Sequence, residues 1–188
     1  MSEFYVLLTA TITGTLGLIQ VLVDKRNTRV RDLKVNHLKK LKFKLEKFYY
    51  PIFFLLQRDK YIGDNIFSDP EKISSDHNEA LDKINLENHT KIMFIIEENI
   101  AETNPKNDIL SEIVKYDKHT SIYKHIRTLG IKDKYPSDYG APYPPMFLLT
   151  IEKRINQIRL EIETIEYDIG SCLPKLKLCN NSSMHDIV

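Results

Sequence analysis

The chain has 188 residues, 28% of them charged, and a formal net charge of +1. This length suits one modest domain. The charges are unevenly placed, because residues 24–47 hold ten basic and three acidic side chains, whereas residues 48–188 hold seventeen basic and twenty-two acidic ones. The mildly acidic balance of the longer part argues against a nucleic-acid surface there, since such a surface needs an excess of Lys and Arg.

The first predicted element is an apolar helix. Residues 4–23 read FYVLLTATITGTLGLIQVLV and carry no charge. Twenty helical residues span about 30 Å, the thickness of a bilayer's hydrocarbon core, which predicts a transmembrane anchor over residues 1–24. A cleaved signal peptide is disfavoured, because the start Met-Ser-Glu has no basic side chain and the apolar run is too long. A buried core helix is the other alternative, although only threonines and Gln20 interrupt the apolar surface.

Basic residues flank this run on one side only. Because Lys and Arg close to a span stay in the cytoplasm, we expect a single-pass protein with its N-terminus outside and the rest of the chain in the cytosol. The candidates for contact with anionic lipid headgroups are the basic residues closest to the bilayer, Lys25, Arg26, Arg29, Arg31 and Lys34. The plainer interpretation of these residues is a topology signal on a solvated helix face.

The helix is predicted to continue to about Gln57. An apolar seam with heptad-like spacing runs along it, formed by Leu38, Leu41, Leu45, Phe48, Ile52 and Leu55. Pro51 removes a backbone donor from this helix, which predicts a kink near residues 47–50. The seam is either packed within the chain or a homo-oligomer interface, and small residues four apart in the apolar run favour self-association. We favour packing within the chain, because the domain needs an apolar face from this helix.

Three more helices follow from apolar residues at 3.6-residue spacing. They are predicted over residues 76–102, 109–129 and 145–170. Turn chemistry such as Gly63-Asp64-Asn65 predicts an irregular segment at 58–75. Residues 131–145 form a loop rich in tyrosine and proline that either docks on a partner or, as we prefer, packs onto the chain's own core.

These elements predict an all-α fold. An N-terminal transmembrane helix is followed by an antiparallel bundle of about four helices within residues 25–171, and by a flexible tail at 172–188. The two cysteines, Cys172 and Cys179, lie in that tail, without CxxC or zinc-ligand spacing.

No motif in the chain identifies a reaction. The nucleotide-binding, zinc-protease and serine-hydrolase signatures are all missing from the sequence. The densest polar cluster consists of Glu112, Tyr116, Asp117, His119, Tyr123 and His125. We interpret these residues, together with His77 and His89, as solvent-exposed or capping side chains. No catalytic, cofactor-binding or metal-ligating residue is therefore predicted, and no cofactor.

The segment Glu46-Lys47-Phe48-Tyr49-Tyr50-Pro51-Ile52 follows the apolar run and the basic helix. In this respect the chain resembles uncharacterised single-pass membrane proteins of bacteria, phages and giant DNA viruses, in which an aromatic-Tyr-Pro turn precedes further helices. The resemblance covers about residues 1–60. It implies a membrane-tethered helical domain in the cytosol and brings no catalytic residues with it.

The sequence leaves three hypotheses for function. The first is a membrane-anchored helical interaction or scaffold protein with an unknown protein partner. The second is a membrane-tethered enzyme whose site assembles around Glu112 and His119. The third is a nucleic-acid binder that uses the basic segment 25–47, which we rank last because the membrane already accounts for much of that charge.

Overall fold

The computed structural model describes residues 2–66 and 75–171, with side chains for 14–62, 64 and 79–171. The predicted tail at 172–188 and the side chain of His77 lie outside the described residues. The chain divides into two compact units, one of Lys39–Ile162 and one that combines Met1–Leu38 with Glu163–Val188. Each unit is considered by itself.

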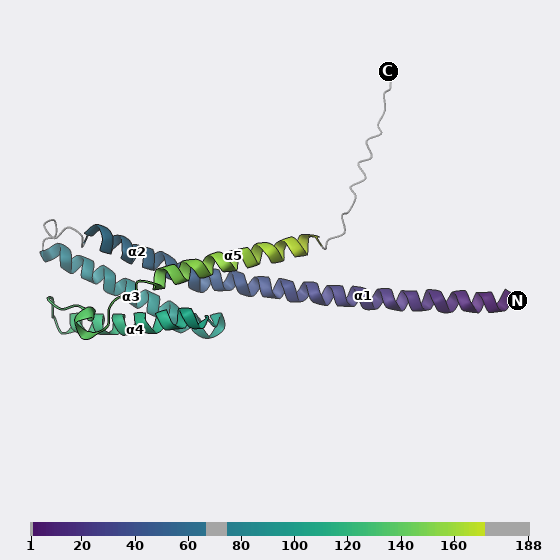
Figure 1. The fold of residues 1–188 in the computed structure, drawn as a ribbon, viewed down its shortest axis with the longest axis horizontal. Helices are drawn as coiled ribbons and strands as arrows, with labels where there is room; N and C mark the ends of the chain where they lie inside the picture. The colour runs from purple at the N-terminus through teal and green to yellow at the C-terminus, as the bar shows by residue number, and fades with distance from the viewer. Residues whose placement is uncertain (1, 67–74, 172–188) are drawn as a thin grey trace, which may run out of the picture. The chain divides into compact units, whose positions relative to one another are not determined.

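A single helical run occupies the N-terminal third of the chain (Figure 1). It consists of α1 (Ser2–Lys44), a π-helical turn η1 (Leu45–Tyr49) and α2 (Tyr50–Ile66). The π-helical turn lies where the sequence predicted a kink. In it the Tyr50 N–H donates to the Leu45 carbonyl, five residues back, so the chain accommodates Pro51, which has no N–H of its own to donate.

The irregular segment predicted at 58–75 is wrong in its first half, because α2 continues to Ile66. The turn residues Gly63-Asp64-Asn65 suggested an earlier end to the helix. Ile62 is buried beside them, so tertiary packing outweighs the local preference for a turn.

The remaining helices lie within a few residues of their predicted positions. They are α3 (Ser75–Thr103), α4 (Asn107–Thr128) and α5 (Phe147–Ser171), and a short 3₁₀ helix, η3 (Pro136–Tyr139), lies in the tyrosine-proline loop. None of the described residues lies in a β-strand. The all-α prediction is therefore confirmed, whereas the closed antiparallel bundle stays a prediction.

The core of the unit Lys39–Ile162 draws side chains from every one of its α-helices. Those least exposed to solvent are Phe48, Tyr49, Ile52, Leu56, Ile92, Ile109, Tyr116, Phe147, Ile151 and Ile158. The π-helical turn and α2 both pack against α3, and α3 packs against α4. The apolar seam is buried from Leu41 to Leu55, as predicted for packing within the chain.

In the other unit, every described residue of α1 from Gly14 to Leu33 is exposed. Lys34 is half-buried, and its Nζ pairs with Asp168 Oδ2 on α5 at 2.9 Å. A helix through residues 4–23 is present, as predicted. Among the residues that the structure describes, however, no helix is sufficiently long and apolar to cross a membrane.

Candidate functional site

A pocket of about 540 Å³ lies within the unit Lys39–Ile162. Its polar wall comes from α2, α3, α4 and the loop before α5, through Asp59, Asp82, His89, His119, Tyr123 and Tyr143. Pro145, Leu148 and Leu149 add an apolar wall. This volume and this mixture of walls are typical of small-molecule sites, in which a few polar groups orient a largely apolar ligand.

His119 connects α4 to the tyrosine-proline loop through a hydrogen bond. Its Nδ1 lies 2.9 Å from the Ala141 carbonyl oxygen, which can only accept, so Nδ1 carries the proton of the neutral ring. Burial lowers the pKa of His119, and the Ala141 hydrogen bond offsets part of that effect. The ring is therefore neutral at pH 7, with Nε2 as an acceptor.

His89 is buried in an aromatic environment. Its ring centroid lies 5.6 Å from that of Tyr116, 5.7 Å from His119 and 5.2 Å from Tyr123, all with near edge-to-face geometry. Burial, and secondly the neighbouring His119, lower the pKa of His89 to about 3. Its buried Nδ1 has no hydrogen-bond partner, so His89 is a neutral imidazole with an unsatisfied ring nitrogen.

Asp59 is the most deeply buried carboxyl group at the pocket, with a side chain only 7% exposed. Its Oδ1 accepts a 2.6 Å hydrogen bond from Asn88 Nδ2, whereas Oδ2 has no hydrogen bond and lies 3.7 Å from His89 Nε2. Burial raises the pKa of Asp59 to about 6, although the Asn88 bond and Arg58 act in the opposite direction. At neutral pH, Asp59 is thus an anion beside an uncharged histidine.

Asp82, by contrast, has a cationic partner. Its Oδ2 lies 2.9 Å from Arg127 Nε, and its Oδ1 accepts from the Tyr123 hydroxyl. The Arg127 guanidinium lies over the ring of Tyr123, 4.9 Å from its centroid, and over that of Tyr135 at 5.6 Å. Arg127 therefore compensates the charge of Asp82 and uses both aromatic faces.

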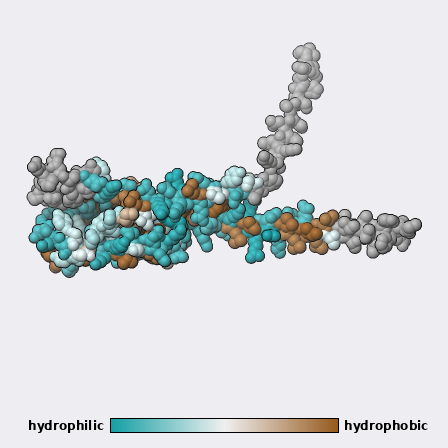
Figure 2. All heavy atoms as spheres, in the orientation of Figure 1, coloured by the Kyte–Doolittle hydropathy of each residue, from teal (hydrophilic) through white to brown (hydrophobic). Residues whose placement is uncertain are grey.

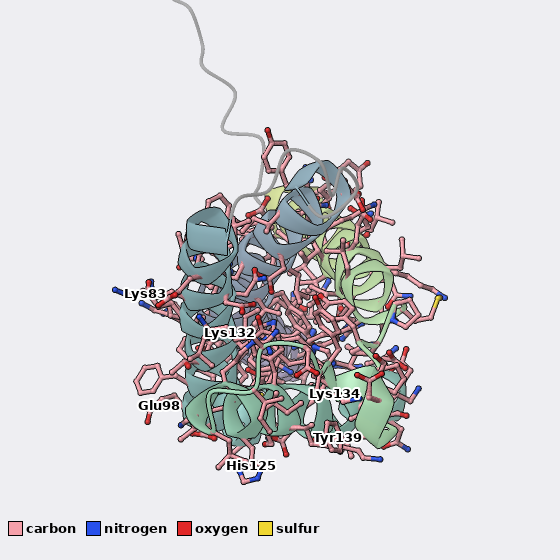
Figure 3. The ribbon with its side chains drawn as sticks, turned by 90° about the vertical axis from the view of Figure 1, so that its left-hand side faces the viewer. Lys83, Glu98, His125, Lys132, Lys134 and Tyr139 are labelled. Carbon is pink, nitrogen blue, oxygen red and sulfur yellow. The ribbon has the colours of Figure 1, made fainter. Side chains whose placement is uncertain are left out.

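The cluster predicted on the third helix divides into two groups. Tyr116, His119 and Tyr123 are buried together beside His89, so the interpretation of these side chains as exposed is wrong. Asp117 and His125 are exposed, and His125 points away from the helices in Figure 3.

Glu112 is also buried, but it pairs with Lys115 at 2.6 Å, and the structure records no contact between Glu112 and His119. A site assembled around Glu112 and His119 therefore stays a hypothesis, since His119 and His89 line the pocket whereas Glu112 is not among its lining residues. In the described residues no group of three or more His, Cys, Asp and Glu side chains could hold a metal ion.

Sequence reasoning missed Asp59, Asn88 and Asp82 as members of the site. It expected the tyrosine-proline loop to pack on the core, and Tyr143 does so, with its ring centroid 5.3 Å from that of His119 and 6.0 Å from that of Tyr116. Tyr135 and Tyr139 are exposed. Asp59 was missed because the helix was expected to end near Gln57, whereas α2 continues to Ile66. Asp82 and Asn88 lie within α3, where the helical pattern alone gave no sign of what they face.

Comparison of the chain with protein-family models, curated proteins and solved structures finds no match. The function must therefore be inferred from the residues themselves.

Proposed function

We propose that this chain is a membrane-anchored helical interaction protein, held in a bilayer by residues 4–23. The observation that supports the anchor is the exposure of large apolar side chains in the described half of that run. Leu16, Leu18, Ile19, Val21, Leu22 and Val23 are each 49–67% exposed. Figure 2 shows a hydrophobic stretch on the surface of α1.

Such a surface is costly in water. Burying an aliphatic side chain of this size contributes roughly 1.5–3 kcal/mol, so transfer of these six side chains into lipid would contribute on the order of 5–10 kcal/mol, given that each is about half exposed. A contiguous apolar patch of this kind is characteristic of protein or membrane contact. The run of twenty uncharged residues, long enough for a hydrocarbon core, favours the membrane.

The charges that follow support an N-out orientation with the unit Lys39–Ile162 in the cytosol. Lys25, Arg26, Arg29 and Arg31 are exposed on α1 directly after the run. Each basic side chain near an anionic leaflet contributes about 1 kcal/mol. Lys34, the fifth predicted headgroup contact, pairs with Asp168, so it is the weakest of these candidates.

A membrane-tethered enzyme is the second candidate. Its support is the pocket, where a neutral His119 and the buried Asp59 would offer a base and a carboxylate. Binding of nucleic acid by residues 25–47 ranks third, because the same charges serve the proposed membrane contact.

The anchor is tested by fractionation of cells that express the full chain. We expect the protein in the membrane pellet after carbonate extraction. Leu16→Lys should reduce the pelleted fraction, since a Lys near the centre of a span costs about 2.5–3.5 kcal/mol. Leu33→Lys is the matched control, because Leu33 is equally exposed on α1 but lies outside the run. Release of the parent by carbonate would contradict the anchor.

The orientation has its own test in a microsomal translation system. The sequons at Asn88 and Asn181 should stay unglycosylated if the C-terminal part faces the cytosol. Glycosylation at either asparagine would reverse the proposed orientation and leave the anchor intact.

A further inference from the structure

We propose that the 540 Å³ pocket binds a small organic monoamine, whose ammonium group lies toward Asp59 and His119 and whose apolar body lies against Leu148 and Leu149. This inference goes beyond the proposed membrane anchoring and does not depend on it. It rests on the hydrogen-bonding polarity, the charge and the apolar wall of the pocket.

Two residues that line the pocket, Asp59 and His89, each carry a buried polar atom without a hydrogen-bond partner, and both atoms are acceptors. Asp59 Oδ2 has no hydrogen bond. His89 Nε2 faces that carboxylate, which places the ring proton on Nε2 and leaves the unpartnered Nδ1 as an acceptor. His119 donates from Nδ1 to Ala141, so its Nε2 is also an acceptor. A buried polar group without a partner is costly, and a ligand rich in N–H donors would satisfy this arrangement.

The charge of the pocket favours a cation. Among the described residues that line it, three are acidic, Asp59, Asp64 and Asp82, and one is basic, Lys60, while the two histidines are neutral. Arg127 compensates Asp82, but the nearly buried Asp59 has no cation within ion-pair distance unless His89 is protonated. An anionic ligand would add to this excess of negative charge, whereas an ammonium ion would reduce it.

The tyrosine rings that line the pocket, Tyr123, Tyr135 and Tyr143, also favour a cationic ligand. Arg127 already occupies the faces of Tyr123 and Tyr135, which establishes that these rings accept a cation in this setting. Tyr143 lines the same pocket, is 36% exposed, and has no cation recorded over its ring. An ammonium group near Tyr143 would gain a cation–π interaction in addition to the charge of Asp59.

The apolar side of the pocket favours a monoamine over a polyamine. Leu148, Leu149 and Pro145 form one side of the pocket, and a polyamine would leave its further charges against them. A single ammonium on an aromatic or aliphatic body fits both sides. The probe of choice is therefore phenethylamine, compared with its neutral counterpart 2-phenylethanol and the anion 3-phenylpropionate.

The test is a calorimetric titration of the full chain in detergent micelles at pH 7.5. We expect phenethylamine to bind at least tenfold more tightly than 2-phenylethanol, and 3-phenylpropionate to show no binding. Asp59→Asn should weaken phenethylamine binding at least tenfold. The control is Asp117→Asn, an exposed carboxylate on α4 outside the pocket wall, which should leave the affinity unchanged.

Each contrary result would overturn the proposal. Equal affinity for phenethylamine and 2-phenylethanol would mean that the pocket recognises only the apolar body of the ligand. Stronger binding of 3-phenylpropionate would mean that the pocket prefers an anion. If none of the three probes binds, the pocket is not a monoamine site. Loss of binding in Asp59→Asn counts as support only if the circular dichroism spectrum and melting curve establish that the variant is folded.

Discussion

Replacing Phe48 with alanine is expected to lower the free energy of unfolding by about 3–5 kcal/mol. Phe48 lies in the π-helical turn with no solvent exposure, and its ring meets that of Tyr49 edge-on, with centroids 5.0 Å apart. The turn packs against α3, so truncation would leave a cavity in the centre of the unit Lys39–Ile162. Denaturant unfolding of the full chain, followed by helical circular dichroism, measures the loss.

Phe54→Ala is the matched control for this prediction. Phe54 lies only six residues further on, in α2, but it is 67% exposed, so the same truncation should change stability by about 0.5 kcal/mol or less. Equal effects at the two positions would contradict the burial of the seam. If Phe48→Ala unfolds like the parent but loses cross-linked oligomers, the seam is an interface between copies of the chain.

Replacing Asp59 with asparagine is expected to stabilise the protein at neutral pH. A pKa of about 6, in place of the ordinary carboxyl value of 3.8, means that folding disfavours the ionised group. This corresponds to roughly 3 kcal/mol at 1.36 kcal/mol per tenfold change in the acid constant. Asparagine removes the charge, and its side-chain oxygen can still accept the hydrogen bond from Asn88.

The pH dependence of this gain follows from the direction of the pKa shift. In the parent, the stability associated with protonated Asp59 is complete below pH 3.8 and is lost as the pH rises through about 6. The asparagine variant has no such loss, so its advantage should be largest near pH 7.5 and shrink toward pH 4.5. Parallel melts of parent and variant across this range provide the measurement.

His89 changes the stability of the parent and of the variant with pH in the direction opposite to Asp59. Its pKa falls to about 3 on folding, so its contribution is complete above pH 6.5 and declines as the pH falls toward 3. Because His89 is present in both proteins, its contribution largely cancels in the difference in stability between the variant and the parent. A variant less stable than the parent at pH 7.5 would mean that His89 is protonated and pairs with Asp59. The outcome thus distinguishes a buried ion pair from an isolated buried carboxylate.

The helices could be predicted from the sequence because their apolar residues recur with a strong period. Pro70, Pro105 and the prolines at 136–145 separate these patterns, and α3, α4 and α5 lie within a few residues of the predicted ranges. The end of α2 was predicted nine residues too early, because the burial of Ile62 depends on tertiary packing. That part of α2 carries Asp59.

The site was harder to predict for a related reason. His119 and Tyr123 are four residues apart, so periodicity alone places them on one face of α4. It does not reveal that the same face meets His89 on α3 and Tyr143 in the loop. Polar and aromatic side chains on a charged helix resemble a solvated surface until the packing of the neighbouring helices is known.

The π-helical turn has a consequence for how the length of this chain can change. Its i to i+5 bond from Tyr50 to Leu45 accommodates one residue more than an α-helical turn does. Loss of one exposed residue there, such as Glu46, would restore an ordinary turn and keep Asp59 facing the pocket. Loss of a residue within α2 would instead rotate everything after it in that helix by about 100°. Within the packed part of this helical run, from Leu41 to Ile62, Leu45–Tyr49 is therefore the segment best able to tolerate a single-residue deletion.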